Sequence, residues 1–164
     1  MIYEFKIALI GSAGSGKTSI IKRLYSDEFN NKYIATLETE VKPIIMFCTN
    51  NHIIQFNIWD CPEKEQSFKC GYINASACIG VIENGNKRSV SYLQKELKDK
   101  LLSNIPIFTA LNKTKTRPID NIDAFPDAIH VSAKYGNNLY ELFLNIARQL
   151  TGLNDLDFIC TINP

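Results

Sequence analysis

The stretch GSAGSGKT at residues 11–18 constrains this chain more than any other part of its 164 residues. It follows an apolar run directly, and the residues after it have the spacing of a helix. Gly11 and Gly16 permit a tight turn in which successive N–H groups face inward, Lys17 adds a positive charge, and Thr18 offers a hydroxyl to Mg²⁺. The N-terminal end of the following helix adds its positive dipole. The pattern predicts a strand–loop–helix unit that binds nucleotide phosphate.

The rest of the chain alternates apolar runs with helix-period segments, which is typical of βαβ units. Strands are predicted at Tyr3–Ile10, Val41–Cys48, Ile53–Trp59, Ala77–Ile82, Ile105–Leu111 and Ala128–Val131. Helices are predicted at Lys17–Ser26, Val90–Leu102 and Leu139–Leu150. The polar turn at 49–52 favours an antiparallel hairpin. We therefore predict an α/β fold with a six-stranded, mainly parallel sheet, helices on both faces, and ligand at the carboxyl ends of the strands.

Composition and charge exclude several classes. A formal net charge of +1 gives no electrostatic argument for nucleic acid, and no run is long enough to span a membrane. The five cysteines have no C-x-x-C spacing, so neither a zinc site nor a disulfide framework is expected. No leader or lipidation motif is visible. We expect a single domain over residues 1–164, monomeric and without a membrane anchor, in the cytoplasm or nucleus.

Polar residues follow three further apolar strands. Asp60 ends the run FNIWD, where a carboxylate can serve Mg²⁺, usually through a water. The pair Asn112 and Lys113 and the triplet at 132–134 each follow another strand. In this order and spacing the last two segments resemble the base-reading loops of small GTPases of the Ras superfamily.

Within that superfamily the stretch EFNNKYIATLETEVKP at 28–43 resembles the first switch and following strand of the Ran family of nuclear-transport GTPases. The resemblance runs over nearly the whole chain. It implies that Thr36 closes on Mg²⁺ and the γ-phosphate, that Tyr33 covers the phosphates, and that Phe29 lies against the base or ribose. It also implies GTP or GDP with Mg²⁺ as ligands, and effectors that include transport receptors of the importin-β type.

The predicted site combines these segments. Its metal ligands are Thr18, Thr36 and Asp60. Its nucleotide-binding residues are Gly11, Ser12, Ala13, Gly14, Ser15, Gly16, Lys17, Thr18, Ser19, Phe29, Tyr33, Thr36, Asn112, Lys113, Lys115, Ser132, Ala133 and Lys134.

The sequence departs from the family pattern where hydrolysis is catalysed. The second switch of the family opens D-x-x-G-Q, whereas this chain has Asp60-Cys61-Pro62-Glu63-Lys64. Lys64 stands where a glutamine orients the attacking water, and an ammonium has three donors and no acceptor. Ala13 stands where many relatives have glycine, and its methyl group would crowd the γ-phosphate. We therefore expect weak or absent GTP hydrolysis.

A second departure affects base recognition. The N-K-x-D pattern of the family is Asn112-Lys113-Thr114-Lys115 here. A carboxylate at position 115 would accept two hydrogen bonds from guanine, and losing them could cost about 10²–10⁴ in affinity. The Ala133 amide, if placed as in the family, still favours a 6-oxo purine. Guanine is the first prediction, and xanthine, with a carbonyl for Lys115, is the alternative.

Two functional hypotheses from different classes result. The first is a Ran-like GTP-binding protein with weak hydrolysis. The second is a non-catalytic interaction protein that keeps the Ran-like switch surface and competes with Ran at transport receptors. A nucleotide kinase is less favoured, because such enzymes usually carry an arginine-rich lid, whereas Arg23, Arg88 and Arg117 are widely spaced.

Overall fold

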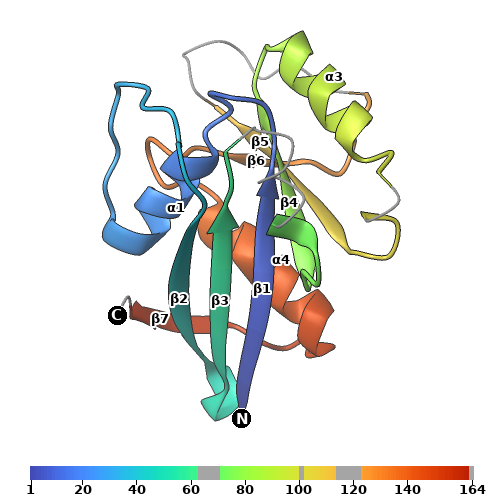
Figure 1. Ribbon diagram of the computed structural model, residues 1–164. Helices are drawn as coiled ribbons and strands as arrows, with labels where there is room; N and C mark the ends of the chain where they lie inside the picture. Colours follow the sequence, from blue (N-terminus) through green and yellow to red (C-terminus); the bar gives the residue numbers. More distant parts are fainter. Residues whose placement is uncertain (63–70, 100–101, 114–122, 163–164) are drawn as a thin grey trace.

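The apolar runs of the sequence form the strands of one twisted sheet in the computed structural model (Figure 1). The structure describes residues 1–62, 71–99, 102–113 and 123–162. The strands run in the order β6-β5-β4-β1-β3-β2-β7. Their bounds are β1 Ile2–Ile10, β2 Glu40–Cys48, β3 Ile53–Asp60, β4 Ala77–Glu83, β5 Ile107–Asn112, β6 Ile129–Val131 and β7 Phe158–Ile162.

Four of the six strand pairings are parallel, as expected for βαβ connections. β1 lies between β3 and β4, and β5 continues the sheet from β4 to β6. β2 and β3 form the predicted antiparallel hairpin through the short 3-10 turn η1, Thr49–Asn51. Within the described residues the α/β class, the mainly parallel sheet and the hairpin are confirmed.

Helices cover both faces of the sheet, as predicted. The helix α1, Lys17–Ser26, and the helix α4, Leu139–Thr151, bury their apolar stripes against one face, and α4 crosses behind the strands in Figure 1. Phe143 of α4 meets Phe56 of β3 edge-on, with ring centroids 5.3 Å apart. The helix α3, Lys87–Glu96, packs on the other face through Leu93, directly above Gly80. None of the helices in the described part of the chain is long and apolar enough to cross a bilayer.

The prediction of six strands was wrong by one. β7 adds to the outer edge of β2 in an antiparallel register, with Ile45 opposite Ile162 and Phe47 opposite Cys160. Its five residues follow the acidic segment 154–157 and carry little alternation, so pairing with β2 rather than local pattern defines the strand.

Two elements differ from the prediction by more than one residue at an end. The helix predicted at Val90–Leu102 is α3 at Lys87–Glu96, because the Asn86 side chain accepts hydrogen bonds from the N–H groups of Arg88 and Ser89 and caps an earlier start. The strand predicted from Ile105 begins at Ile107, after Pro106, which has no N–H to donate.

Candidate functional site

The loop 11–16 joins β1 to α1 at the carboxyl end of the central strand. Gly14 and Gly16 have φ values of 76° and 102°, a region that disfavours other residues. A side chain at Gly16 would collide with the Asn112 amide, and a Cβ at Gly11 would lie 2.5 Å from the Val81 carbonyl oxygen. Gly16 caps α1 without a side-chain hydrogen bond. The backbone is therefore shaped so that an anion can approach the N–H groups at the start of α1.

Lys17 is folded back over this loop. Its ammonium donates to the carbonyl oxygens of Gly11 (2.7 Å) and Ser12 (3.0 Å), and the residue is 8% exposed. The carbonyls fix the charge above the loop where phosphate oxygens would lie. The role of Lys17 as a phosphate ligand stays a prediction from the sequence.

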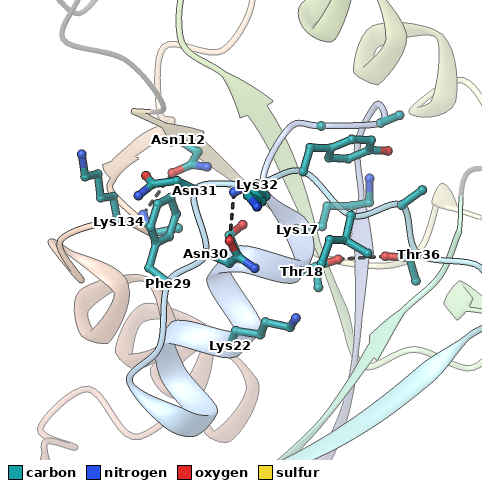
Figure 2. Close-up of a pocket in the computed structure, with 18 of the residues that line it drawn as sticks. Lys17, Thr18, Lys22, Phe29, Asn30, Asn31, Lys32, Thr36, Asn112 and Lys134 are labelled. Atoms are coloured by element: carbon teal, nitrogen blue, oxygen red, sulfur yellow. Dashed lines mark hydrogen bonds between the residues drawn. The ribbon is translucent and has the colours of Figure 1, made fainter.

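Three side chains predicted as metal ligands meet beside the loop. The Thr18 hydroxyl donates to Asp60 Oδ2 at 2.5 Å. The same hydroxyl lies 2.9 Å from the Thr36 hydroxyl (Figure 2). The second oxygen, Asp60 Oδ1, is buried without a hydrogen-bond partner. Burial raises the pKa of the Asp60 carboxyl above its usual range, although the Thr18 hydroxyl and the Lys17 ammonium oppose the rise. The structure therefore brings together residues from α1, the 27–39 loop and β3.

This group fits a magnesium ion. Mg²⁺ prefers hard oxygen ligands and commonly uses one or two protein side chains together with phosphates and waters. The partnerless Asp60 oxygen and the two hydroxyls are such donors. The described residues contain no cluster of three His, Cys, Asp or Glu side chains that could hold a metal. A cation here would thus depend on Thr18, Thr36, Asp60 and the nucleotide itself.

Asn112 connects the phosphate loop to the loop after β6. Its Nδ2 donates to the Ser15 carbonyl and its Oδ1 accepts from the Ala133 N–H, both at 3.1 Å, and the residue is 2% exposed. The N–H of Ala133, predicted to read a base carbonyl, therefore donates to Asn112 in this structure. The predicted residue Ser132 holds its own loop, because its hydroxyl accepts from the Tyr135 N–H at 3.3 Å.

A cleft of about 650 Å³ runs past both groups, a size typical of small-molecule sites. Figure 2 shows Phe29, Asn31, Asn112 and Lys134 at one end of it, and Lys17, Thr18 and Thr36 at the other. Its lining includes the lysines Lys17, Lys22, Lys32, Lys113 and Lys134, and the described lining contains no Asp or Glu. The excess of positive charge suits a polyanion such as a nucleotide.

Most of the predicted nucleotide-binding residues line this cleft. They are Ala13, Gly14, Gly16, Lys17, Thr18, Ser19, Phe29, Tyr33, Thr36, Asn112, Lys113, Ala133 and Lys134. Gly11, Ser12 and Ser15 belong to loop 11–16 but are not among the lining residues of the cleft. The Ser12 hydroxyl donates to Ser89 of α3 at 3.2 Å. Lys64 and Lys115, with Glu63, lie outside the described residues.

Sequence reasoning missed the polar cleft residues Lys22, Asn30, Asn31 and Lys32. It also missed Arg23, which donates to the carbonyl of the cleft residue Ala133. Asn30, Asn31 and Lys32 stand inside the quoted switch segment, so the resemblance could have indicated them. Lys22 and Arg23 gave no signal, because their positions in α1 read as ordinary helix surface.

A phosphate-binding loop after β1, a threonine and a strand-end aspartate beside it, and an asparagine joining it to the β6 loop define the nucleotide-binding α/β fold of the P-loop GTPase class. A sequence model of the Ras of Complex (Roc) domain of DAPkinase matches residues 6–115, about two thirds of the chain. The chain belongs to the Roc family of Ras-like GTPase domains. The match confirms membership of the Ras superfamily, and the Ran likeness stays a prediction from sequence.

Proposed function

We propose that this chain binds a guanine nucleotide with Mg²⁺ in the cleft and hydrolyses GTP slowly or not at all. The observation that carries the proposal is the convergence of Lys17, Thr18, Thr36 and Asp60 at one end of a lysine-lined cleft. Membership of the Roc family supports the choice of a guanine nucleotide.

Each residue has a distinct role in this proposal. Lys17 would neutralise the terminal phosphates, while the N–H groups that follow Gly14 and Gly16 would bind their oxygens. Thr18, Thr36 and Asp60 would hold Mg²⁺, which neutralises charge on the phosphates when bound. Phe29 would lie against the base or ribose, and Tyr33, 67% exposed here, would cover the phosphates.

Slow hydrolysis is proposed from three departures of the sequence from the family pattern. Lys64 replaces the glutamine that places the attacking water, and Glu63 replaces a glycine. Ala13 lines the cleft with an exposed methyl group. A protein that keeps the binding residues and lacks the water-placing residue would remain in its GTP-bound state for long periods.

The residues that would select the base fit the family pattern less well than the residues that would bind the phosphates. Lys115 replaces the carboxylate that would accept hydrogen bonds from guanine, and the described lining offers no other acid. Asn112 and Ala133 remain in place at this end of the cleft. Guanine is therefore proposed as the base. Xanthine is the alternative, because its extra carbonyl would accept a hydrogen bond from Lys115.

Calorimetric titration with GDP and with the slowly hydrolysed analogue GTPγS, each with Mg²⁺, tests the proposal. Replacing Lys17→Ala removes a charge held at the phosphates, so affinity should fall by at least about 100-fold. The matched control is Lys95→Ala, an exposed lysine on α3, which should leave affinity unchanged within about twofold. Absence of nucleotide binding by the wild-type chain, or equal effects of the two substitutions, would refute the assignment.

A second function is favoured by the exposed apolar side chains along the 33–41 segment. Tyr33, Ile34 and Leu37 are 67, 66 and 75% exposed, and Val41 is 44% exposed. Contiguous exposed apolar groups mark interaction surfaces. The chain would then bind effectors through this segment, and the Ran likeness suggests receptors of the importin-β type in the cytoplasm or nucleus. Receptor binding that does not change with the bound nucleotide and is lost in a Leu37→Asp variant would favour a non-catalytic interaction protein over a nucleotide-dependent switch.

A further inference from the structure

Arg23 joins three segments at the end of the cleft that contains Phe29, Asn112 and Lys134, where the proposed function places the base. Its Nε donates to the Ala133 carbonyl at 3.0 Å, and its Nη2 donates to the Lys134 carbonyl at 2.6 Å. Its Nη1 bonds both the backbone oxygen (2.9 Å) and the carboxylate (2.8 Å) of Asp27, the C-cap of α1. The side chain is 19% exposed. One guanidinium thus fixes the 133–136 loop to α1 and to the start of the 27–39 loop.

The same network continues to the phosphate loop. Ala133, whose carbonyl accepts from Arg23, donates its N–H to Asn112, and Asn112 donates to the Ser15 carbonyl. Gly136 completes the 133–136 loop at φ 76°, and a Cβ there would lie 3.6 Å from Arg23 Cδ. The loop therefore lies over the arginine stem as well as on its fork.

We propose that Arg23 is a positioning residue that sets the affinity of the cleft for the nucleoside part of the nucleotide. The inference rests on the proposed function, since it needs a base in this cleft. Arg23 touches no ligand position; it orients the 133–134 backbone against which a base would lie. With Lys115 in place of the base-reading acid, a larger share of base affinity depends on the geometry of this loop.

The guanidinium matters by shape and not only by charge. Its fork gives parallel donors to two consecutive carbonyls and a third nitrogen to Asp27, which a lysine ammonium cannot reproduce from one point. Arg23→Lys keeps the charge and the apolar stem and removes the fork. It should release the 133–134 loop and leave loop 11–16 unchanged.

Calorimetry with GDP and with inorganic pyrophosphate separates the two parts of the site. In the Arg23→Lys chain the Kd for GDP should rise about tenfold, as expected for the loss of one or two charge-assisted hydrogen bonds, while that for pyrophosphate stays within about twofold. Arg148→Lys is the matched control: Arg148 donates Nε to the Leu156 carbonyl at 2.9 Å at the far end of α4. It should change neither constant.

Hydrogen exchange on the wild-type chain tests the premise of this inference, that the nucleoside part of the nucleotide lies against residues 133–136. GDP should slow amide exchange at 133–136 and at the end of α1, whereas pyrophosphate should slow exchange at 11–18 alone. Equal protection of 133–136 by both ligands would overturn the inference.

The outcomes separate the inference from the proposed function. If the wild-type chain binds neither GDP nor pyrophosphate, both fail. If it binds GDP and Arg23→Lys weakens GDP and pyrophosphate equally, the nucleotide assignment stands, Arg23 is merely structural, and the inference is wrong.

Discussion

Asn112→Ala should lower the free energy of unfolding by more than the loss of one ordinary side-chain hydrogen bond would. The substitution leaves two buried backbone groups, the Ser15 carbonyl and the Ala133 N–H, without their partner at 3.1 Å. An unpaired buried group costs about 1–3 kcal/mol, so the pair gives about 2–6 kcal/mol. A middle value of about 4 kcal/mol corresponds to a fall in Tm of about 8–16 °C in a chain of this length.

Urea unfolding followed by far-ultraviolet circular dichroism measures this loss. Asn57→Ala is the control, because Asn57 also makes two side-chain hydrogen bonds, to Glu4 (2.6 Å) and Gln55 (3.0 Å), on a half-buried face of the sheet where water can replace them. Its cost should stay below about 1 kcal/mol. The rise in Tm caused by GDP should also be smaller in Asn112→Ala than in the wild type. Equal unfolding midpoints for the two variants would refute the bridging role of Asn112.

Three further outcomes are expected. Phe143→Ala removes a fully buried ring that packs on Phe56, and urea unfolding should show a loss of about 3–5 kcal/mol; a loss under about 1 kcal/mol would contradict the packing. Burial raises the pKa of Asp60 above the ordinary 3.8, so the folded state binds this proton more tightly than the unfolded state. The stability that this proton contributes is therefore lost as pH rises from the unfolded-state pKa to the folded-state pKa. Asp60→Asn should flatten the decline of Tm with pH over that interval and abolish Mg²⁺-dependent stabilisation by GDP, and an unchanged profile would show that Asp60 is not the titrating group. Lys64→Gln restores a water-placing amide and should raise single-turnover GTP hydrolysis at least about tenfold in a phosphate-release assay, whereas an unchanged rate would assign the block to Ala13 or Glu63.

The fold could be predicted wherever its cause is local. The β1–loop–α1 unit follows from apolar residues, glycines and a helix period within one short stretch, and the β2–β3 hairpin follows from a polar turn. β7 could not be predicted in this way, because what makes Phe158–Ile162 a strand is the free edge of β2, more than a hundred residues earlier in the chain. The early start of α3 was predictable in principle, since Asn86 is a good N-cap residue.

The site residues show the same difference between those that belong to a local motif and those that act through long-range contacts. The motifs that contain Lys17, Thr18 and Asp60 can be identified from the residues adjacent to them in the sequence. Their convergence could therefore be predicted from the sequence. Arg23 contacts residues 110 and 111 positions away and carries no motif. Ligand contacts demand particular side chains at fixed spacing, whereas a support such as Arg23 needs only donors that reach two backbone carbonyls, which many sequences provide. Changes in base affinity within such a site can therefore arise through its supports while every motif residue stays in place.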